Sequence, residues 1–358
     1  MPDGIDFDGQ HLLALVRAGK SPFHDQWDVN LLVQEIAENL CAQVEDIPYV
    51  SRGSNNYGIH IKLSNGMDIV ARLARGDVNM PDFDGFPIDK QVPEVKFEAE
   101  VYKLLLPEPD ILVSRLLYYR IPKLHEASLY KYQVPPEFAV EWLRERLFEQ
   151  KRESFPVPVA PTREFCIALF ISKIEATIKN VGDMIGWGDD HNTVGPIAAA
   201  AKKSLLSLIP HIMPKGGDED ILYRFVIDHG DFGIHNMSII MNVNQQPRIT
   251  SLYDWETECI VPAILSDPLM AVIVDLTIDK NANPAVTRLS DTMTADELEE
   301  AATWSRFYFE ALFSNAPDYK RSIKAGRDAR HQWFALRDWR GDDPEKYFGD
   351  LGAWAKEK

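Results

Sequence analysis

The spacing of hydrophobic residues changes early in the chain. Residues 30–44 carry apolar side chains at intervals of three to four positions, which places them on one face of a helix. Residues 47–75 alternate instead, so that Ile59 and Ile61 fall on one side and His60 on the other. We therefore predict a helix over 30–44, followed by three antiparallel strands.

Two turns join the predicted strands. Asn65-Gly66 predicts a type I′ hairpin, because both central residues of that turn need a positive φ and the sequence alternates on either side. Residues 52–56 form the loop between the first two strands. This part of the chain is therefore expected to be a small meander of three strands.

An insertion rich in Pro, Asp and Gly follows at residues 76–93. Helical spacing returns over residues 94–106, and Pro107 and Pro109 predict the end of that helix. Residues 137–143 resemble a further strand.

Helical spacing dominates the rest of the chain, with predicted helices over residues 163–180, 196–209, 295–313 and 319–339. Residues 262–339 as a whole read as successive helices. The exceptions are a short apolar run at 225–227 and a hairpin in which residues 237–243 and 248–254 flank a turn. These patterns predict an α+β fold, with a sheet-containing amino-terminal half at 1–142 and a mostly helical half at 143–358.

Length and composition narrow the class of protein. A chain of 358 residues is long for one core, which favours two domains. No apolar stretch of eighteen or more residues occurs, so we expect no membrane segment. The formal charge of −17 argues against a nucleic-acid partner, because it repels polyanions. The acidic amino terminus and three widely separated cysteines favour a reducing, cytoplasmic setting.

The candidate catalytic and metal-binding residues lie around the predicted hairpin of the second half. Asp231 and Asn236 lie five positions apart in one loop, and Asp254 comes at the far end of the hairpin that follows them. A hairpin that returns to the edge where it began would bring these side chains to one point. Oxygen ligands of this kind suit Mg²⁺, which binds a few protein oxygens together with water and phosphate, and they suit Zn²⁺ less well.

These residues resemble the motifs of a known family. His229-Gly230-Asp231, Asn236 and Asp254-Trp255-Glu256 are similar to the catalytic and metal motifs of the aminoglycoside phosphotransferase and choline kinase-like family, in its fungal phosphotransferase branch. The resemblance implies a bilobal protein-kinase-like fold, with a small antiparallel-sheet lobe that carries one main helix and a larger helical lobe. It implies phosphoryl transfer from ATP, or GTP, to a hydroxyl of a small molecule.

The same resemblance assigns roles. Asp231 would be the catalytic base, Asn236 and Asp254 would hold Mg²⁺ on the nucleotide phosphates, and His229 would brace the loop rather than shuttle protons. Ser266-Asp267-Pro268 resembles the acidic-proline segment that follows the metal motif in the family.

The amino-terminal half supplies candidates for nucleotide binding. Arg72 occupies the third-strand position that the family usually gives to lysine, and its guanidinium provides the same charge with a forked geometry. Glu100 is the expected carboxylate partner of Arg72, ahead of Glu98 and Glu94.

Two further segments are implied by the resemblance. Ser54 and Asn55 would cover the nucleotide, and Glu141 and Leu143 would form the hinge that reads the base. The sequence departs from the family in the arginine at position 72, in the insertion after it, and in residues 145–162, which have no counterpart.

Two alternative functions compete with the phosphotransferase hypothesis. A kinase-like nucleotide-binding scaffold without catalysis would keep the fold, although such proteins typically lose one of the three polar groups. His229-x-Asp231 with the distant His331 imitates the two-histidine, one-carboxylate iron site of 2-oxoglutarate oxygenases. That site requires a β-rich barrel, which the helical spacing of residues 262–339 does not predict. His235 is expected to be structural, and Cys259 is expected to be a small buried hydrophobic residue.

The sequence leaves the acceptor open. Four acidic residues of the second half are compatible with a cationic alcohol such as an amino sugar or an amine: Glu256, Glu258, Asp267 and Asp275. A protein substrate is disfavoured, because no recognisable activation segment follows Asp254-Trp255-Glu256.

Overall fold

The computed structural model of the chain describes residues 7–23, 28–53, 56–74, 88–109, 111–119, 157–178, 195–255, 259–268, 275–287, 294–338 and 344–358. The chain divides into two compact units. Unit 1 comprises residues 1–99 and 115–132, and unit 2 comprises residues 100–114 and 133–358. The boundary expected between residues 142 and 143 lies outside the described residues.

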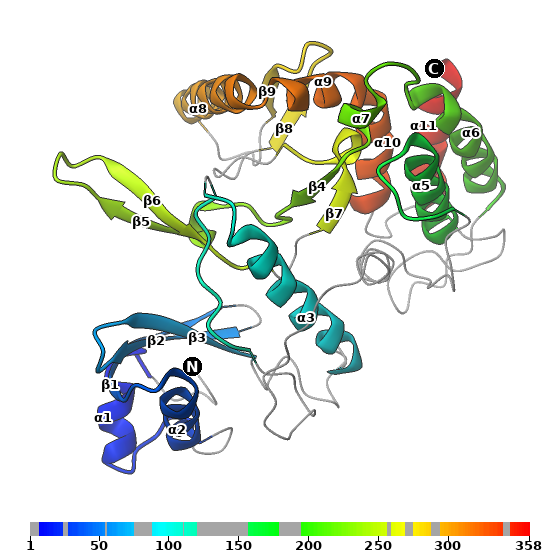
Figure 1. The fold of residues 1–358 in the computed structure, drawn as a ribbon. Helices are drawn as coiled ribbons and strands as arrows, with labels where there is room; N and C mark the ends of the chain where they lie inside the picture. Colours follow the sequence, from blue (N-terminus) through cyan, green and yellow to red (C-terminus); the bar gives the residue numbers. More distant parts are fainter. Residues whose placement is uncertain are drawn as a thin grey trace. The chain divides into compact units, whose positions relative to one another are not determined.

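Unit 1 is built on a three-stranded antiparallel sheet (Figure 1). The chain forms α1 (Leu12–Arg17), α2 (Val29–Leu40), β1 (Val44–Arg52), β2 (Asn56–Leu63), β3 (Asp68–Ala74) and α3 (Ile88–Leu105). The last turns of α3, from residue 100 on, belong to unit 2. The strand order is β1-β2-β3, and Ile59 pairs with Val50 on one side and with Ala71 on the other. Burial of Val50, Ile59 and Ile61 against α1 and α2 removes apolar surface from water and forms the core of this unit.

The three predicted strands are confirmed, but two details of this region differ from prediction. The first helix ends at Leu40 because Cys41 adopts a left-handed φ of 52°, and Val44 already belongs to β1, where it pairs with Leu63. The Asn65-Gly66 turn is not type I′. Gly66 has a φ of 80°, whereas Asn65 is not among the described residues with positive φ.

The helix that follows the sheet is longer than predicted. α3 begins at Ile88, inside the expected insertion, and ends at Leu105, two residues before the predicted stop at Pro107. The strand expected at residues 137–143 lies outside the described residues.

In its described residues, unit 2 combines helices with three small two-stranded antiparallel sheets (Figure 1). Its helices are α5 (Arg163–Thr177), α6 (Pro196–Ile212), α7 (Glu219–Leu222), α8 (Ala295–Asn315), α9 (Pro317–Ala325), α10 (Arg327–Asp338) and α11 (Pro344–Glu357), with 3₁₀ turns η2 (Ile234–Asn236) and η3 (Ala263–Leu265). The strands are β4 (Phe225–Asp228), β5 (Met237–Met241), β6 (Pro247–Leu252), β7 (Cys259–Pro262), β8 (Asp275–Ile278) and β9 (Pro284–Thr287). β4 pairs with β7, β5 with β6 and β8 with β9.

The main core of unit 2 lies among α5, α6, α10 and α11. Phe170 of α5 packs edge-on against Trp333 of α10, with ring centroids 5.3 Å apart. Gly352 of α11 approaches α6 so closely that an added Cβ would lie 2.6 Å from the Cβ of Ala201. α11, which periodicity did not single out, therefore completes this core.

The sequence predicted most helices of unit 2 and missed some of its strands. Helices over 163–180, 196–209 and 295–313 are confirmed as α5, α6 and α8, and the hairpin of β5 and β6 is also confirmed. The helix predicted over 319–339 is divided at Gly326 into α9 and α10. Residues 262–339 are not all helical, because β8 and β9 form a hairpin within them, and β7 was not foreseen.

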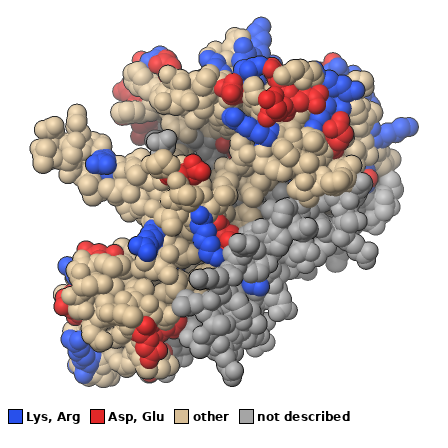
Figure 2. Space-filling model, in the orientation of Figure 1, with Lys and Arg blue, Asp and Glu red and all other residues tan. Residues whose placement is uncertain are grey.

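The described residues form an α+β fold of small antiparallel sheets and many helices. None of the described helices combines the length and the hydrophobicity that a membrane span requires. Figure 2 shows that acidic and basic side chains lie intermixed over the region of α7, α9 and α10. The hairpin of β5 and β6 is mostly uncharged and exposes Ile240, Met241 and Val243.

Candidate functional site

The loop between β4 and β5 places Asp231 at the surface. β4 ends at Asp228, and Gly230 then adopts a φ of 75°, a left-handed conformation that a residue with a Cβ adopts only at a cost. The chain turns there and enters η2, which leads directly into β5. The side chain of Asp231 is 57% exposed, so its carboxylate is accessible to a substrate.

Asn236 ties the two ends of this loop together. Its side chain is buried, and Nδ2 donates to the backbone oxygen of Asp231 at 2.8 Å and to Asp231 Oδ2 at 3.2 Å. These two bonds fix the orientation of the Asn236 amide. Its Oδ1 accepts no hydrogen bond from the residues that the structure describes.

His235 also contacts the candidate base, although the sequence suggested only a structural role. His235 Nε2 lies 3.1 Å from Asp231 Oδ2, and because an ionised carboxylate only accepts, the imidazole donates. Asp231 Oδ2 therefore receives two donors. Asp231 Oδ1 receives none within the described part of the chain.

Asp254 follows β6 in a left-handed conformation with a φ of 66°. The backbone nitrogen of Tyr253 donates to the backbone oxygen of Asn236 at 3.1 Å, so the residue before Asp254 is held against Asn236. The negative charges of Asp254 and Asp231 both act on His229. The structure thus brings Asp231, Asn236 and Asp254 to one end of the β5–β6 hairpin.

His229 lies buried behind these groups. Its Nε2 donates to the backbone oxygen of Tyr253 at 3.2 Å, and its ring centroid lies 4.4 Å from that of Trp255. Burial lowers the pKa of His229, and the nearby carboxylates oppose that shift only in part. The imidazole is therefore neutral near pH 7 and braces the loop against the segment that carries Asp254.

The donor set at this end of the hairpin fits a hard divalent cation. Asn236 offers an amide oxygen and Asp254 a carboxylate, which are the ligand types that Mg²⁺ prefers. Within the described residues, no group of three or more His, Cys, Asp and Glu side chains could hold a metal. His229, Asp231 and His331 are all described, so the iron triad of the rival reading is not formed. His331 instead packs on Trp354, with ring centroids 4.5 Å apart.

Asp228 is a residue of this site that the sequence did not reveal. Its carboxylate accepts from the backbone nitrogen of Gly230 at 3.3 Å and from that of Asp267 at 3.1 Å. Desolvation raises the pKa of Asp228 to about 6, and the backbone hydrogen bonds partly oppose the shift. The one signal in the sequence was its position between an apolar strand and His229, which does not distinguish it from a solvated strand end.

Asp267, one of the acidic residues compatible with a cationic acceptor, lies beside Asp228, to which its backbone nitrogen donates. Arg337 Nη1 of α10 lies 3.3 Å from Asp267 Oδ2. The neighbouring Ser266 shares a hydrogen bond of 2.9 Å with Tyr319 of α9. The segment after η3 therefore connects the loop between β4 and β5 to α9 and α10.

In unit 1, Arg72 forms its ion pair with Glu98 rather than with the expected Glu100. Arg72 Nη1 lies 2.6 Å from Glu98 Oε1, and both side chains are partly buried. Residues two positions apart on a helix point about 200° apart, so only one of these glutamates can face the sheet. Glu100 instead pairs with Lys103 one turn further along α3.

The remaining candidates for nucleotide binding lie outside the described residues: Ser54, Asn55, Glu141 and Leu143. On either side of Ser54 and Asn55, Gly53 N donates to Asn56 O at 2.8 Å. Ser51 already pairs with Gly58 in the sheet.

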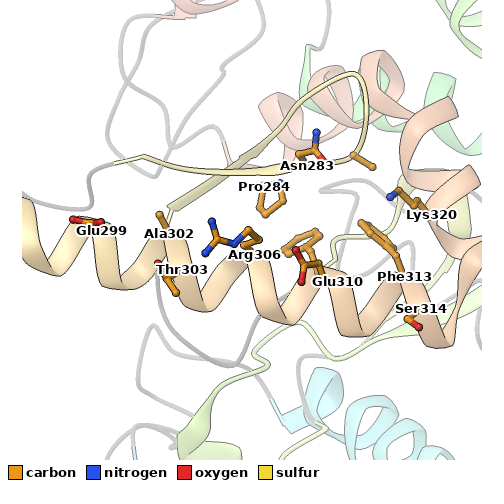
Figure 3. A pocket seen from close by; sticks show the side chains of 12 residues that line it. Asn283, Pro284, Glu299, Ala302, Thr303, Arg306, Glu310, Phe313, Ser314 and Lys320 are labelled. Atoms are coloured by element: carbon orange, nitrogen blue, oxygen red, sulfur yellow. The ribbon is translucent and has the colours of Figure 1, made fainter.

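A groove of about 700 Å³ lies elsewhere in unit 2, between α8, α9 and the turn of β8 and β9 (Figure 3). Phe309 and Phe313 form its apolar lining, and the Nζ of Lys320 lies 5.3 Å from the Phe313 ring. Its remaining charged residues are Glu299, Arg306 and Glu310. Two carboxylates and two cations balance, so the lining favours no ionic class of ligand, and none of the predicted site residues contributes to it.

The chain was also compared with known proteins. It matches no protein-family model and no curated protein. The functional assignment therefore rests on the residues and their geometry.

Proposed function

We propose that this protein is a Mg²⁺-dependent phosphotransferase that moves the γ-phosphoryl group of ATP, or GTP, to a hydroxyl of a small molecule. The observation that carries the proposal is the convergence of Asp231, Asn236 and Asp254 at one end of the β5–β6 hairpin. Phosphoryl transfer is catalysed mainly by positioning and charge neutralisation, which requires this kind of oxygen-rich site.

The proposal gives each side chain a task. Asp231 accepts the proton of the acceptor hydroxyl and orients it, and its exposed carboxylate is placed for this. Asn236 Oδ1 and the Asp254 carboxylate hold Mg²⁺, which neutralises phosphate charge when it is bound. His229, neutral and buried, keeps the segments of Asp231 and Asp254 together.

Unit 1 provides the proposed nucleotide-binding lobe of a kinase-like bilobal fold. Arg72 extends from the third strand of an antiparallel sheet and pairs with a glutamate of the following helix. A cation fixed by a helix carboxylate is the arrangement that kinases use to hold nucleotide phosphates. The guanidinium favours bidentate contact with phosphate oxygens.

Nucleotide binding is the first test. Thermal unfolding is measured with MgATP, with MgGTP and with Mg²⁺ alone, and nucleotide consumption is then measured with a panel of hydroxylated amines, sugars and amino acids. We expect a magnesium nucleotide to raise the Tm and at least one alcohol to accelerate its consumption. No shift with either nucleotide would contradict the proposal.

Two isosteric variants test the chemistry. Asp231→Asn and Asp254→Asn keep the size of the side chain and remove the carboxylate charge. We expect each to reduce kcat by about 10²-fold or more while the fold is kept. Asp220→Asn is the matched control, because Asp220 is a carboxylate of unit 2 that takes no part in the proposed site. Full activity in either site variant would exclude the assigned role.

The second candidate is a nucleotide-binding scaffold that transfers no phosphate. It predicts a Tm shift with MgATP but no nucleotide consumption with any acceptor. The three polar groups favour the enzyme, because a scaffold needs no exposed carboxylate at position 231.

A further inference from the structure

The two oxygens of Asp231 are in different environments. His235 Nε2 and Asn236 Nδ2 both donate to Oδ2, at 3.1 Å and 3.2 Å, while Oδ1 accepts from none of the described residues. A carboxylate held by one oxygen cannot rotate freely about χ2. The other oxygen is then presented to solvent in a fixed direction.

The Asn236 amide would remain in place without the Asp231 carboxylate, because its Nδ2 also donates to the backbone oxygen of Asp231 at 2.8 Å. The imidazole of His235 has no such second bond within the described residues. Of the two donors to Asp231 Oδ2, His235 is therefore the one that bonds only to the carboxylate.

The backbone around His235 is arranged so that the ring can reach Asp231. An added Cβ on Gly233 would lie 2.4 Å from Cε1 and 2.6 Å from Nδ1 of His235, so the ring occupies the space that a side chain at position 233 would take. The φ of Gly233 is −146°, an extended value that any residue adopts. The glycine is thus needed for space and not for its conformation. Tyr253 Oη donates to the backbone oxygen of His235 at 2.9 Å and holds this residue in place.

We propose that His235 is a positioning residue, which holds Oδ2 of Asp231 so that Oδ1 faces the acceptor hydroxyl. The inference rests on the proposed phosphotransferase function and adds to it the geometry of the base. The side chains of Asp231 and His235 are 57% and 48% exposed, so an acceptor can approach Oδ1 while the ring stays on Oδ2. His235 acts through Asp231 and does not touch the reacting atoms.

Substitution of His235 separates this role from a structural one. His235→Ala removes the donor and should lower kcat about 10- to 100-fold, because a poorly oriented base loses much of its effect, with the KM for MgATP changed less than about twofold. His235→Gln places an amide nitrogen at a similar reach and should restore kcat to within about threefold of the wild type. The rates are measured as MgATP hydrolysis with water as acceptor, and with any alcohol that the panel identifies.

Gly233→Ala tests the same contact without altering the histidine. The added methyl group displaces the imidazole from Asp231 and should lower kcat to a similar extent. In the His235→Ala background the same substitution should have little further effect, since the contact is already lost. Fully additive losses would overturn the proposal.

The ¹⁵N resonances of the imidazole give a readout that needs no activity. In the wild type we expect the Nε2–H tautomer of His235, identified by its loss in His235→Gln, and we expect its resonances to move in Asp231→Ala and in Gly233→Ala. His211→Ala, on the exposed end of α6, is the control and should leave them unchanged. Resonances that stay fixed in both site variants would exclude the contact. Moving resonances in a protein without transferase activity would support the contact and place the failure in the proposed function.

Discussion

At the scale of single residues, Asp254 combines a candidate ligand with an unusual backbone. Its φ of 66° is tolerated by Asp and Asn far better than by branched side chains. Asp254→Asn should therefore change the free energy of unfolding by less than about 0.5 kcal/mol, whereas Asp254→Val should lower it by about 1–2 kcal/mol. Urea unfolding of both variants measures this. Equal stabilities would show that the left-handed conformation imposes no cost here.

Asp228 should make stability depend on pH. Its pKa in the folded state is raised to about 6 from an ordinary value of 3.8, so between these values the folded protein binds a proton that the unfolded chain does not. The contribution of Asp228 to the free energy of unfolding therefore rises as pH falls from about 6 to about 4. The groups that act on its carboxyl are Asp267, Arg337 and Tyr319.

The matched variant is Asp228→Asn, which does not titrate. Between pH 7 and pH 4.5 the stability of the wild type should improve relative to this variant by about 1–3 kcal/mol. Urea unfolding of both proteins at several pH values measures the difference. A difference that is constant with pH would show that the carboxyl of Asp228 is not desolvated as the structure indicates.

Spacing along the sequence was enough to single out Asp231, Asn236 and Asp254, because a hairpin returns to the edge from which it started. It could not reveal the contacts of His235 or Asp228. The contact of His235 depends on the empty space above Gly233, and that of Asp228 depends on a segment almost forty residues away. Such contacts are set by tertiary packing and produce no periodic pattern of residues in the sequence.

At the scale of elements, the break between α9 and α10 has a steric cause. A Cβ on Gly326 would lie 2.2 Å from the backbone oxygen of Ile264 in η3. The φ of Gly326 is −87°, so alanine is compatible with the backbone conformation, but its Cβ would clash with Ile264. We expect Gly326→Ala to lower the free energy of unfolding by about 1–3 kcal/mol.

Gly217→Ala is the control for this substitution, because no atom lies within 4 Å of its added Cβ. Thermal or urea unfolding of the two variants provides the comparison. If both variants were as stable as the wild type, η3 and α10 would have room to separate.

A carboxylate from α11 caps the first turn of α6. Glu345 Oε2 and Oε1 accept from the backbone nitrogens of Ile197 and Ala198, at 3.0 Å and 3.1 Å. The negative charge also favours the positive end of the helix. Glu345→Gln retains one acceptor and should cost about 0.5–2 kcal/mol in urea unfolding. If Glu345→Gln were as stable as the wild type, water would replace the lost hydrogen bond to α6 without a loss of stability.

The elements that the sequence predicted well are those with long periodic patterns, such as α5, α6 and α8 and the strands of unit 1. The errors have local or long-range physical causes. The split at Gly326 arises from contact with η3, and β7 exists through its pairing with β4, which precedes it by more than thirty residues. The choice of Glu98 over Glu100 depends on how α3 is rotated about its axis, which periodicity leaves undetermined.

At the scale of the whole molecule, the chain has separate hydrophobic cores. One is formed by residues of unit 1, including Ile47 and Ile59, and another is formed by residues of unit 2, including Phe170 and Trp333. Cores without shared members can unfold at different denaturant concentrations. The two units therefore have separate free energies of unfolding.

The proposed function makes a specific prediction for these two cores. If Arg72 of unit 1 takes part in nucleotide binding, MgATP should protect β1–β3 from hydrogen exchange, and if the carboxylates of unit 2 take part, MgATP should protect the β4–β6 region. At a nucleotide concentration of 100 Kd the stabilisation amounts to about 2.7 kcal/mol. Hydrogen exchange is the suitable measurement, because seven of the eight tryptophans lie in unit 2 and fluorescence would report mainly on that unit. Arg72→Ala should abolish the protection of β1–β3, whereas Arg72→Lys, which keeps the charge, should retain part of it. Protection confined to unit 2 and unaffected by Arg72→Ala would mean that Arg72 and Glu98 form a structural ion pair and that nucleotide binding does not involve the sheet.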